Sequence, residues 1–498
     1  MSDRLIKWRD DNLNSVNKAF CPAKWYNATI DLGSGFTRSC FLPLPHPIDL
    51  EELKDNPSAL HNTKHKKKMR KMMLEGTRPA ECSYCWKVED IGRNNISDRV
   101  YRSHEYKLED IQALPNTPWD ANVNLRTVEL SFDRTCNFAC SYCNPSYSTT
   151  WGKDIDKHGP YQKFKTLTAG AYQQNGSWAD PENKYMDDNP YVDAFLRWWP
   201  DLSKDLQVLR ITGGEPSTSP GFWKFLSMVA DKPVPHLNLS INSNLGVKDE
   251  LIDRLIDTTH TLDIESYDIY TSNESYGPHA EYLRDGMDYE KWKSNVVRMI
   301  EEGNIRQIVV MMTISGLSLM SMVEFMDDML ELKKKYGPNK PTLDLNFLRW
   351  PAFMSALNLP DEVKIEAKNK IQKWLDTNRD SGLLLEHEIS QTQRVIDYID
   401  VLDQGHSRAE MDKDKHFHDF KSFYVQYDKR RGKDFKTTFP MLAEWYDTLQ
   451  VDENIADVKM SPGGMEGWEI TEYKPDLLKR NVNLKDKWTR IDLKSYNK

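Results

Sequence analysis

Three cysteines within eight residues are the strongest candidates for a reactive centre in this sequence. Three residues separate Cys136 from Cys140, and two separate Cys140 from Cys143. Short cysteine runs of this kind bind iron–sulfur clusters, because one loop can reach several corners of an iron–sulfur cube. Three thiolates leave one of the four irons open to another ligand. Structural zinc prefers four ligands in a closed tetrahedron, so zinc fits this loop less well.

The other four cysteines, Cys21, Cys40, Cys82 and Cys85, all lie in the first hundred residues. We expect a hairpin with a Gly-rich turn between the first two, and the last two form a CxxC pair. Four soft ligands suit either a closed iron–sulfur cluster or a structural zinc ion, and the residues alone do not separate these alternatives. Seven cysteines fit poorly with a fully paired set of disulfides and fit well as four plus three.

The bulk composition is that of an ordinary globular protein of two or three domains. The chain has 498 residues, of which 39% are hydrophobic and 29% charged, and its net charge is −9. This acidity disfavours nucleic acid as a partner. The start has no apolar segment typical of a secretory signal, and no apolar run approaches the roughly 18 residues that span a bilayer. We therefore expect a cytoplasmic protein with no membrane partner, in which thiols stay reduced.

Strands that alternate with helices are expected to position the three-cysteine loop. This alternation predicts a parallel sheet, either open and doubly wound or closed into part of a βα barrel, with ligands at the carboxyl ends of its strands. The loop follows the first expected strand, and a Gly-Gly-Glu-Pro turn at 213–216 follows the second. The six expected strands span residues 127–132, 207–211, 237–242, 261–267, 307–314 and 343–348.

Three other segments flank or interrupt this alternation. A basic run at 64–71 is expected to form a solvated helix face, with binding of an anionic partner as the alternative. A segment at about 151–205 is rich in Trp, Tyr and Asp, including Trp178 and Tyr185, and either contacts the substrate or extends the packing. Beyond residue 350 we expect mainly helices whose aromatic stripes belong to the core.

Taken together, the three-cysteine loop and the Gly-Gly-Glu-Pro turn resemble motifs of the radical SAM superfamily. Tyr142 stands where that family usually has an aromatic residue before the last cysteine. The resemblance implies a partial (βα)6 barrel, a [4Fe–4S] cluster held by the three cysteines, and S-adenosylmethionine (SAM) bound to the open iron. It also implies reductive cleavage of SAM to a 5′-deoxyadenosyl radical, which abstracts a substrate hydrogen.

The same resemblance implies a set of residues around SAM. Glu215 would accept a hydrogen bond from the SAM amino group, and Arg284 would pair with its carboxylate. The alternatives are a plain strand-to-helix turn at 213–216 and, for Arg284, a surface ion pair with Asp285 or Glu281. The full set is Tyr142, Gly213, Gly214, Glu215, Pro216, Ser240, Asn242, Asn244, Glu265, Ser266 and Arg284. Of these, Glu265 and Ser266 are expected to end the fourth strand.

The N-terminal segment resembles a twitch domain, the shorter relative of the SPASM auxiliary-cluster domain. The likeness rests on the hairpin between Cys21 and Cys40 and on the CxxC pair of Cys82 and Cys85. It implies that these four cysteines hold a second, auxiliary [4Fe–4S] cluster. In most relatives this module follows the barrel, whereas here it precedes the barrel.

These expectations combine into one prediction of architecture and function. The fold is α/β, with an N-terminal auxiliary-cluster domain at 1–120, a radical SAM core at 121–350 and a helical C-terminal extension at 351–498. The activity is oxidoreductase-like, on a peptide, a protein or a small alcohol-bearing substrate, with electrons from a donor such as a flavodoxin or ferredoxin. Two alternatives remain: a zinc-stabilised scaffold without catalysis, and a radical SAM enzyme that modifies RNA through the basic run.

Overall fold

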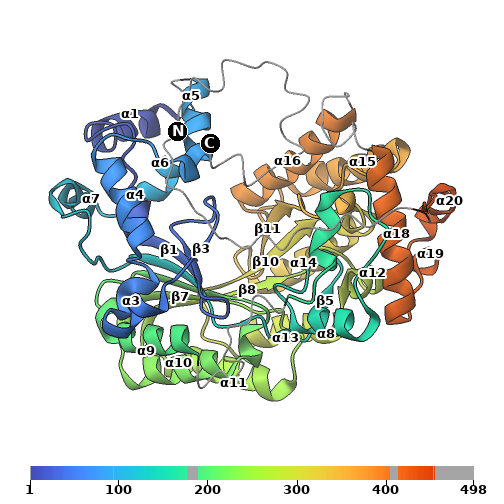
Figure 1. Ribbon diagram of the computed structural model, residues 1–498. Helices are drawn as coiled ribbons and strands as arrows, with labels where there is room; N and C mark the ends of the chain where they lie inside the picture. The colour runs from blue at the N-terminus through green and yellow to red at the C-terminus, as the bar shows by residue number, and fades with distance from the viewer. Residues whose placement is uncertain (1, 93–94, 177–188, 404–412, 453, 455–498) are drawn as a thin grey trace. The chain divides into compact units, whose positions relative to one another are not determined.

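The computed structural model describes residues 2–92, 95–176, 189–403, 413–452 and 454, and these residues fall into two compact units (Figure 1). Described residues up to 130, together with 189–209, form the first, here named the N-terminal unit. Residues 131–176 and the described residues from 210 onward form the second, named the barrel unit. The three domain ranges expected from the sequence stay a prediction.

The N-terminal unit combines a small antiparallel sheet with short helices. As expected, a hairpin lies between Cys21 and Cys40: Thr29 in β1 pairs with Arg38 in β2, and the turn contains Gly35 at a φ of 73°. Its principal elements are α1 (Ser2–Asn12), α2 (Ala23–Tyr26), β1 (Asn27–Asp31), β2 (Phe36–Arg38), β3 (His46–Pro47), α3 (Leu50–Asp55), α4 (Lys64–Leu74), α5 (Ser83–Ile91), α6 (Asp98–Ser103), α7 (Leu108–Ala113) and α9 (Pro190–Leu202).

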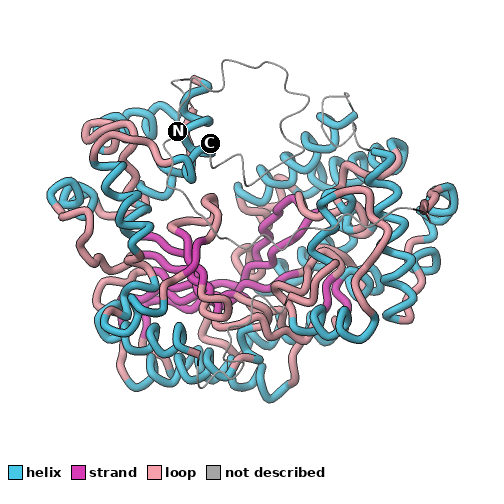
Figure 2. The backbone as a smooth tube through the Cα atoms, in the orientation of Figure 1, coloured by secondary structure: helices cyan, strands magenta, loops and turns pink. Residues whose placement is uncertain are grey.

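The barrel unit is built on a parallel sheet with helices between its strands (Figure 2). The strand order in this unit is β11-β10-β8-β7-β6. All six expected strands are present, and the partial TIM-like barrel is confirmed. The six strands are β4 (Thr127–Ser131), β6 (Val208–Thr212), β7 (Val234–Asn242), β8 (Ile264–Ser272), β10 (Gln307–Ile314) and β11 (Thr342–Phe347). The boundary between the two units falls within β4 and again within β6.

Amphipathic helices connect these strands and bury their apolar faces. In α13, for example, Trp292, Val296 and Met299 recur at helical spacing and are all fully buried. This periodicity gives a helix one apolar stripe, which packs on a sheet while the opposite face stays in water. The main connecting helices are α10 (Pro220–Asp231), α11 (Asp249–Thr261), α13 (Tyr289–Glu301) and α14 (Met322–Tyr336).

The part of the chain after residue 350 is mainly helical, as expected. It contains α15 (Asp361–Asn378), α16 (Glu386–Asp403), α18 (Lys413–Arg431), α19 (Phe435–Thr438) and α20 (Ala443–Thr448). The aromatic stripe of α18 is core: Phe420 and Phe423 are buried. Within the described residues, no helix is both long and apolar enough to cross a membrane.

The first part of the aromatic segment packs against α18. The ring of Tyr161 stacks on Phe423 with centroids 5.1 Å apart, and Trp151, in α8 (Thr149–His158), lies 6.5 Å from Tyr427. For these residues the contacts therefore support a role in packing, which was one of the two alternatives for the segment at 151–205. Trp178 and Tyr185 lie outside the described residues.

The expectation of a solvated basic helix at 64–71 is wrong for two of its side chains. The run forms most of α4, in which Lys66 and Arg70 are fully buried, whereas Lys64 and Lys68 are exposed. The physical reason is the helical period, because Lys66 and Arg70 share one face with the buried Met69 and Met73. Two of the six Lys and Arg side chains that were assigned to the surface are therefore inside the protein.

Candidate metal centres

The three-cysteine loop is held by the first turn of α8. The amide of Cys136 donates to Oγ1 of Thr149 at 3.3 Å, and the hydroxyl of Thr150 donates to the carbonyl of Cys136 at 2.6 Å. The indole of Trp151 donates to the carbonyl of Cys140 at 2.9 Å. These local bonds fix the loop backbone and so determine where its thiols lie.

A two-residue strand pair brings Arg284 to the loop. Strand β5 (Ala139–Cys140) runs antiparallel to β9 (Arg284–Asp285), with Cys140 opposite Arg284. The next amide, that of Ser141, donates to the carbonyl of Leu283 at 2.7 Å. Nη1 of Arg284 consequently lies 3.9 Å from the sulfur of Cys140. This pairing brings together two of the predicted site residues that are far apart in the sequence.

The buried partner of Arg284 is Glu274, which the sequence analysis missed. Their side chains form an ion pair at 2.6 Å, and Oη of Tyr142 donates to the other oxygen of Glu274 at 2.9 Å. The expected alternative, a surface pair with Asp285 or Glu281, is therefore wrong. Nε of Arg284 is buried and has no hydrogen-bond partner in the described part of the chain, so this cation retains a donor for an anionic ligand.

The glycines of the Gly-Gly-Glu-Pro turn allow it to press against the backbone of the cysteine loop. Gly213 has a φ of 130°, and a Cβ on Gly214 would lie 2.3 Å from the carbonyl oxygen of Thr135. The amide of Glu215 donates to that same oxygen at 2.6 Å. A larger residue at position 214 would separate the two loops, because a contact that short is not possible for a side-chain carbon.

The carboxylate of Glu215 is fully buried and accepts hydrogen bonds from inside the protein. Its Oε1 accepts from the amide and hydroxyl of Ser217, at 3.1 and 2.6 Å, and from the hydroxyl of Ser243 at 2.9 Å. Its Oε2 accepts from the amide of Asn244 at 2.6 Å. Burial raises the pKa of Glu215, and these bonds oppose that rise. In this structure the carboxylate joins the turn to the end of β7, and direct contact with SAM stays a prediction.

The remaining predicted residues of the third strand lie where they were expected. Asn242 ends β7 and accepts from Nε of Arg210 at 3.0 Å, and Ser240 is buried two residues earlier. The side chain of Asn244 donates to Oδ1 of Asn137 at 2.8 Å, so it reaches the cysteine loop. Pro216 begins a short 3-10 helix directly after Glu215.

The placement expected for Glu265 and Ser266 is wrong. Both lie at the start of β8, because the strand continues through the β-favouring residues that follow and ends at Ser272. The carboxyl end of β8 is followed by Asn273 and Glu274 instead. Nδ2 of Asn273 is buried without a hydrogen-bond partner among the described residues.

The environment of the three thiols fits a bound cationic group. Burial raises the pKa of all three thiols, to about 12 for Cys143, and the cation Arg284 opposes this rise for Cys140 and Cys143. Buried thiols become thiolates readily when a metal supplies the positive charge. The donor set therefore fits a thiolate-bound metal group.

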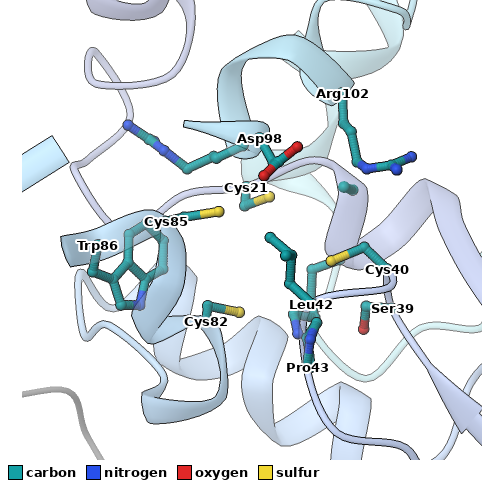
Figure 3. Close-up of a pocket in the computed structure, with 13 residues that line it drawn as sticks. Cys21, Ser39, Cys40, Leu42, Pro43, Cys82, Cys85, Trp86, Asp98 and Arg102 are labelled. Atoms are coloured by element: carbon teal, nitrogen blue, oxygen red, sulfur yellow. The ribbon is translucent and has the colours of Figure 1, made fainter. Parts of the chain in front are cut away.

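The four N-terminal cysteines line a single cavity of the N-terminal unit. Figure 3 shows the sulfurs of Cys21, Cys40, Cys82 and Cys85 around a common space. The three segments that carry them are far apart in the sequence: one precedes α2, one follows β2, and the CxxC pair lies at the start of α5. Burial raises the pKa of Cys21 to about 11 and that of Cys85 to about 12.

Buried ion pairs join the segments around this cavity. Arg99 donates to both carboxylate oxygens of Glu89 in α5, at 3.0 and 2.7 Å, and to the carbonyl of Phe20 at 2.7 Å, next to Cys21. Lys24 pairs with Glu81, the residue before Cys82. The convergence of the four thiols therefore depends on long-range contacts.

Across the described ranges, no three Cys, His, Asp or Glu side chains are gathered closely enough to hold one metal ion directly. In a tetrahedral zinc site the sulfurs are about 3.8 Å apart, because each Zn–S bond is about 2.3 Å long. Thiolates of an iron–sulfur cube stand farther apart, since each binds a different iron.

Comparison with known proteins identifies part of the barrel unit. Residues 130–329 match the model of the Radical SAM superfamily. These residues are thus similar to a radical SAM domain. The match contains the three-cysteine loop, the Gly-Gly-Glu-Pro turn and Arg284. No curated protein matches the chain.

The chain is also similar to several solved structures, but with low sequence identity and low TM-scores. One is Streptococcus suis SuiB bound to S-adenosylmethionine, with 13% identity over 70% of this chain and 69% of that one and a TM-score of 0.32. SuiB bound to precursor peptide SuiA gives 11% identity over 72% and 70%, with a TM-score of 0.33. Native anSMEcpe with bound AdoMet gives 11% identity over 65% and 100%, with a TM-score of 0.31.

Proposed function

We propose that the chain is a radical SAM enzyme whose catalytic [4Fe–4S] cluster is bound by Cys136, Cys140 and Cys143. The observation that carries this proposal is that two segments far away in the sequence meet at the three-cysteine loop. Strand β9 presents Arg284 opposite Cys140, and the Gly-Gly-Glu turn lies against Thr135. Three thiols, a backbone that can approach a ligand closely and a cation with a free donor are what a SAM site needs.

The bound cluster and SAM would supply the electron transfer and the 5′-deoxyadenosyl radical that removes a substrate hydrogen. The protein's own residues hold and orient these groups. Gly213 and Gly214 leave room beside the loop, and Glu274 fixes the guanidinium of Arg284 so that Nε remains available to the SAM carboxylate. Tyr142 supports the same pair from the loop itself.

We infer that Cys21, Cys40, Cys82 and Cys85 bind an auxiliary [4Fe–4S] cluster. Four thiols around one cavity can occupy all four irons, so this cluster would have no open iron for a substrate. Its role would be electron transfer or structural support. The substrate would be a peptide, a protein or a small alcohol-bearing molecule, oxidised or otherwise modified, and the external electron donor a flavodoxin or ferredoxin.

The experiment that tests the catalytic site is SAM cleavage under anaerobic conditions. Protein reconstituted with iron and sulfide is reduced with dithionite and given SAM, and 5′-deoxyadenosine is measured by chromatography. We expect release from the wild type and none from Cys140→Ala. No release from protein with intact clusters, or undiminished release from Cys140→Ala, would contradict the proposal.

Metal analysis tests the alternative of a non-catalytic zinc scaffold. Anaerobically purified protein should contain iron and acid-labile sulfide in amounts that fit two clusters. Cys82→Ala should lose about half of the iron, because it disrupts one of two similar sites. Zinc at both sites without iron would favour the scaffold instead.

A further inference from the structure

Two cations of α4 are buried without an anionic partner. Nζ of Lys66 donates to Oγ1 of Thr37 at 2.7 Å and lies 3.4 Å from Nδ1 of His61. Nε of Arg70 donates to the carbonyl of Lys24 at 3.3 Å. Both side chains are fully buried, and among the residues that the structure describes neither has a carboxylate within ion-pair distance. Their hydrogen-bond partners are neutral groups.

Such an arrangement is unfavourable in the protein by itself. A buried charge without a counter-charge loses its hydration and gains little in return. Burial lowers the pKa of Lys66 well below its ordinary value, and repulsion from Arg70 and Lys24 lowers it further, whereas the more distant charge of Glu81 opposes this lowering only in part. A nearby anion would attract these buried charges and so make their contribution to the stability of the protein favourable.

Both segments that lead to the N-terminal cysteines are bonded to α4. Lys24, whose carbonyl Arg70 contacts, follows Cys21 by three residues and lines the cavity. Thr37, which Lys66 contacts, precedes Cys40 by three residues. The helix therefore lies behind the cavity wall and not on a remote surface.

The cavity wall itself adds to the positive charge. Arg102 lines the cavity, has no carboxylate partner in the described ranges, and its Nε is buried without a hydrogen-bond partner.

We propose that Lys66 and Arg70 are the counter-charges of an anionic thiolate–metal group held by Cys21, Cys40, Cys82 and Cys85. The proposal rests on the proposed function to the extent that these cysteines bind a metal group. Four thiolates exceed the charge of a divalent core by two, whether the core is an iron–sulfur cube or zinc. Lys66 and Arg70, whose described hydrogen-bond partners are neutral, would balance that charge.

The positive charges of α4 should also change the reduction potential of a redox-active metal group. Buried charges act over several ångströms because little water screens them. Positive surroundings favour the more negative, reduced form of a cluster and so raise its reduction potential. Removing one cation should therefore shift the equilibrium toward the oxidised cluster.

The test compares Lys66→Met with wild type in two states, loaded with the metal group and freed of metal by chelation. We expect the substitution to raise the melting temperature of the metal-free protein and to reduce the stabilisation that the metal gives. Loaded protein should also release its metal to a chelator faster. If the group is a cluster, its reduction equilibrium should shift about tenfold toward the oxidised form, which is about 59 mV for one electron.

Two variants serve as controls. Lys68→Met removes an exposed charge from the same helix and should change none of these quantities. Lys66→Arg keeps the charge and should restore the stabilisation by metal. Equal destabilisation of the loaded and metal-free states by Lys66→Met would overturn the proposal. A wild type that takes up metal only at the three-cysteine loop would instead overturn the auxiliary site, and a zinc site would show the stability effects without a redox transition.

Discussion

The tetrapeptide Cys-Ser-Tyr-Cys occurs twice in this chain, once in each unit, and adopts two different structures. At 82–85 it begins α5, and Tyr84 is half exposed. At 140–143 it leaves strand β5 in a turn, and Tyr142 is buried against Glu274 and Arg284. Identical residues therefore reach opposite environments, which shows that the surrounding fold decides what the motif does.

The two cysteine sites also differ in how they are assembled and in how their charges are balanced. Three thiols of the barrel unit come from one loop, and the nearest cation, Arg284, has its own carboxylate partner, Glu274. The four thiols of the N-terminal unit come from three segments. Of the cations nearby, Lys24 and Arg99 have carboxylate partners, whereas Lys66 and Arg70 have none within ion-pair distance among the described residues. The thiols of the first site are therefore positioned by one loop, whereas the convergence of the second set of thiols depends on tertiary contacts.

The largest expected effect comes from removing one thiol from each site. Cys140→Ala should abolish the reductive cleavage of SAM, whereas Cys82→Ala should leave substrate-independent cleavage in place, because only the cluster proposed for the first site would have an open iron. Iron content and 5′-deoxyadenosine release measure this difference. Equal loss of cleavage in both variants would show that the two sites do not act separately.

The second-largest effects are expected for variants that break the buried ion pair beside each site. Arg99→Met and Arg284→Met should each lower the free energy of unfolding by about 3–5 kcal/mol, because each leaves a buried carboxylate unpaired. Arg99→Met should also release the auxiliary metal, since Arg99 links the Cys21 segment to α5. Arg284→Met should keep its cysteine loop loaded and weaken SAM binding. Denaturant unfolding, iron content and equilibrium dialysis with SAM measure these effects.

The matched control for these two variants is Arg197→Met, which removes an exposed pair with Asp193. It should change the unfolding free energy by less than about 1 kcal/mol. If Arg99→Met retained all of its iron, the long-range assembly of the four-cysteine site would be refuted.

A smaller effect is expected for Gly214→Ala. The added Cβ would meet the carbonyl of Thr135, so the turn and the cysteine loop must separate, at a cost of about 1–3 kcal/mol. SAM affinity should fall with stability, as urea unfolding and dialysis would show. Gly92→Ala is the control, because the nearest atom to its Cβ is the side-chain nitrogen of Asn95 at 3.5 Å. Equal changes in the two variants would contradict the close approach of the loops.

The smallest expected effect is a difference in stability between Phe variants of the two tyrosines of the repeated tetrapeptide. Tyr142→Phe removes a hydrogen bond to Glu274 and should lower the unfolding free energy by about 1 kcal/mol. Tyr84→Phe should have no measurable effect, because that residue is 51% exposed. Thermal denaturation of the two variants, measured side by side, tests whether the environments differ as described.

Much of the fold could be predicted from local patterns. The six strands and the helices between them follow from periodic apolar residues, and the hairpin between Cys21 and Cys40 follows from its Gly-rich turn. Strand ends were less certain: β8 continues to Ser272 because nothing in its residues marks an earlier stop. For that reason Glu265 and Ser266 were assigned to the wrong end of the strand, and Glu274 was missed.

The sequence by itself determined which residues can do chemistry here: seven cysteines in a set of three and a set of four, and a Gly-Gly-Glu turn one strand after the first set. Spacing along the chain is enough for this, because a short loop has few ways to present its thiols. Only the tertiary structure decided which charges lie beside each set. Burial and ion pairing depend on residues far apart in the sequence, so Lys66, Arg70 and Glu274 could not be placed by local pattern. The two Cys-Ser-Tyr-Cys segments differ for the same reason.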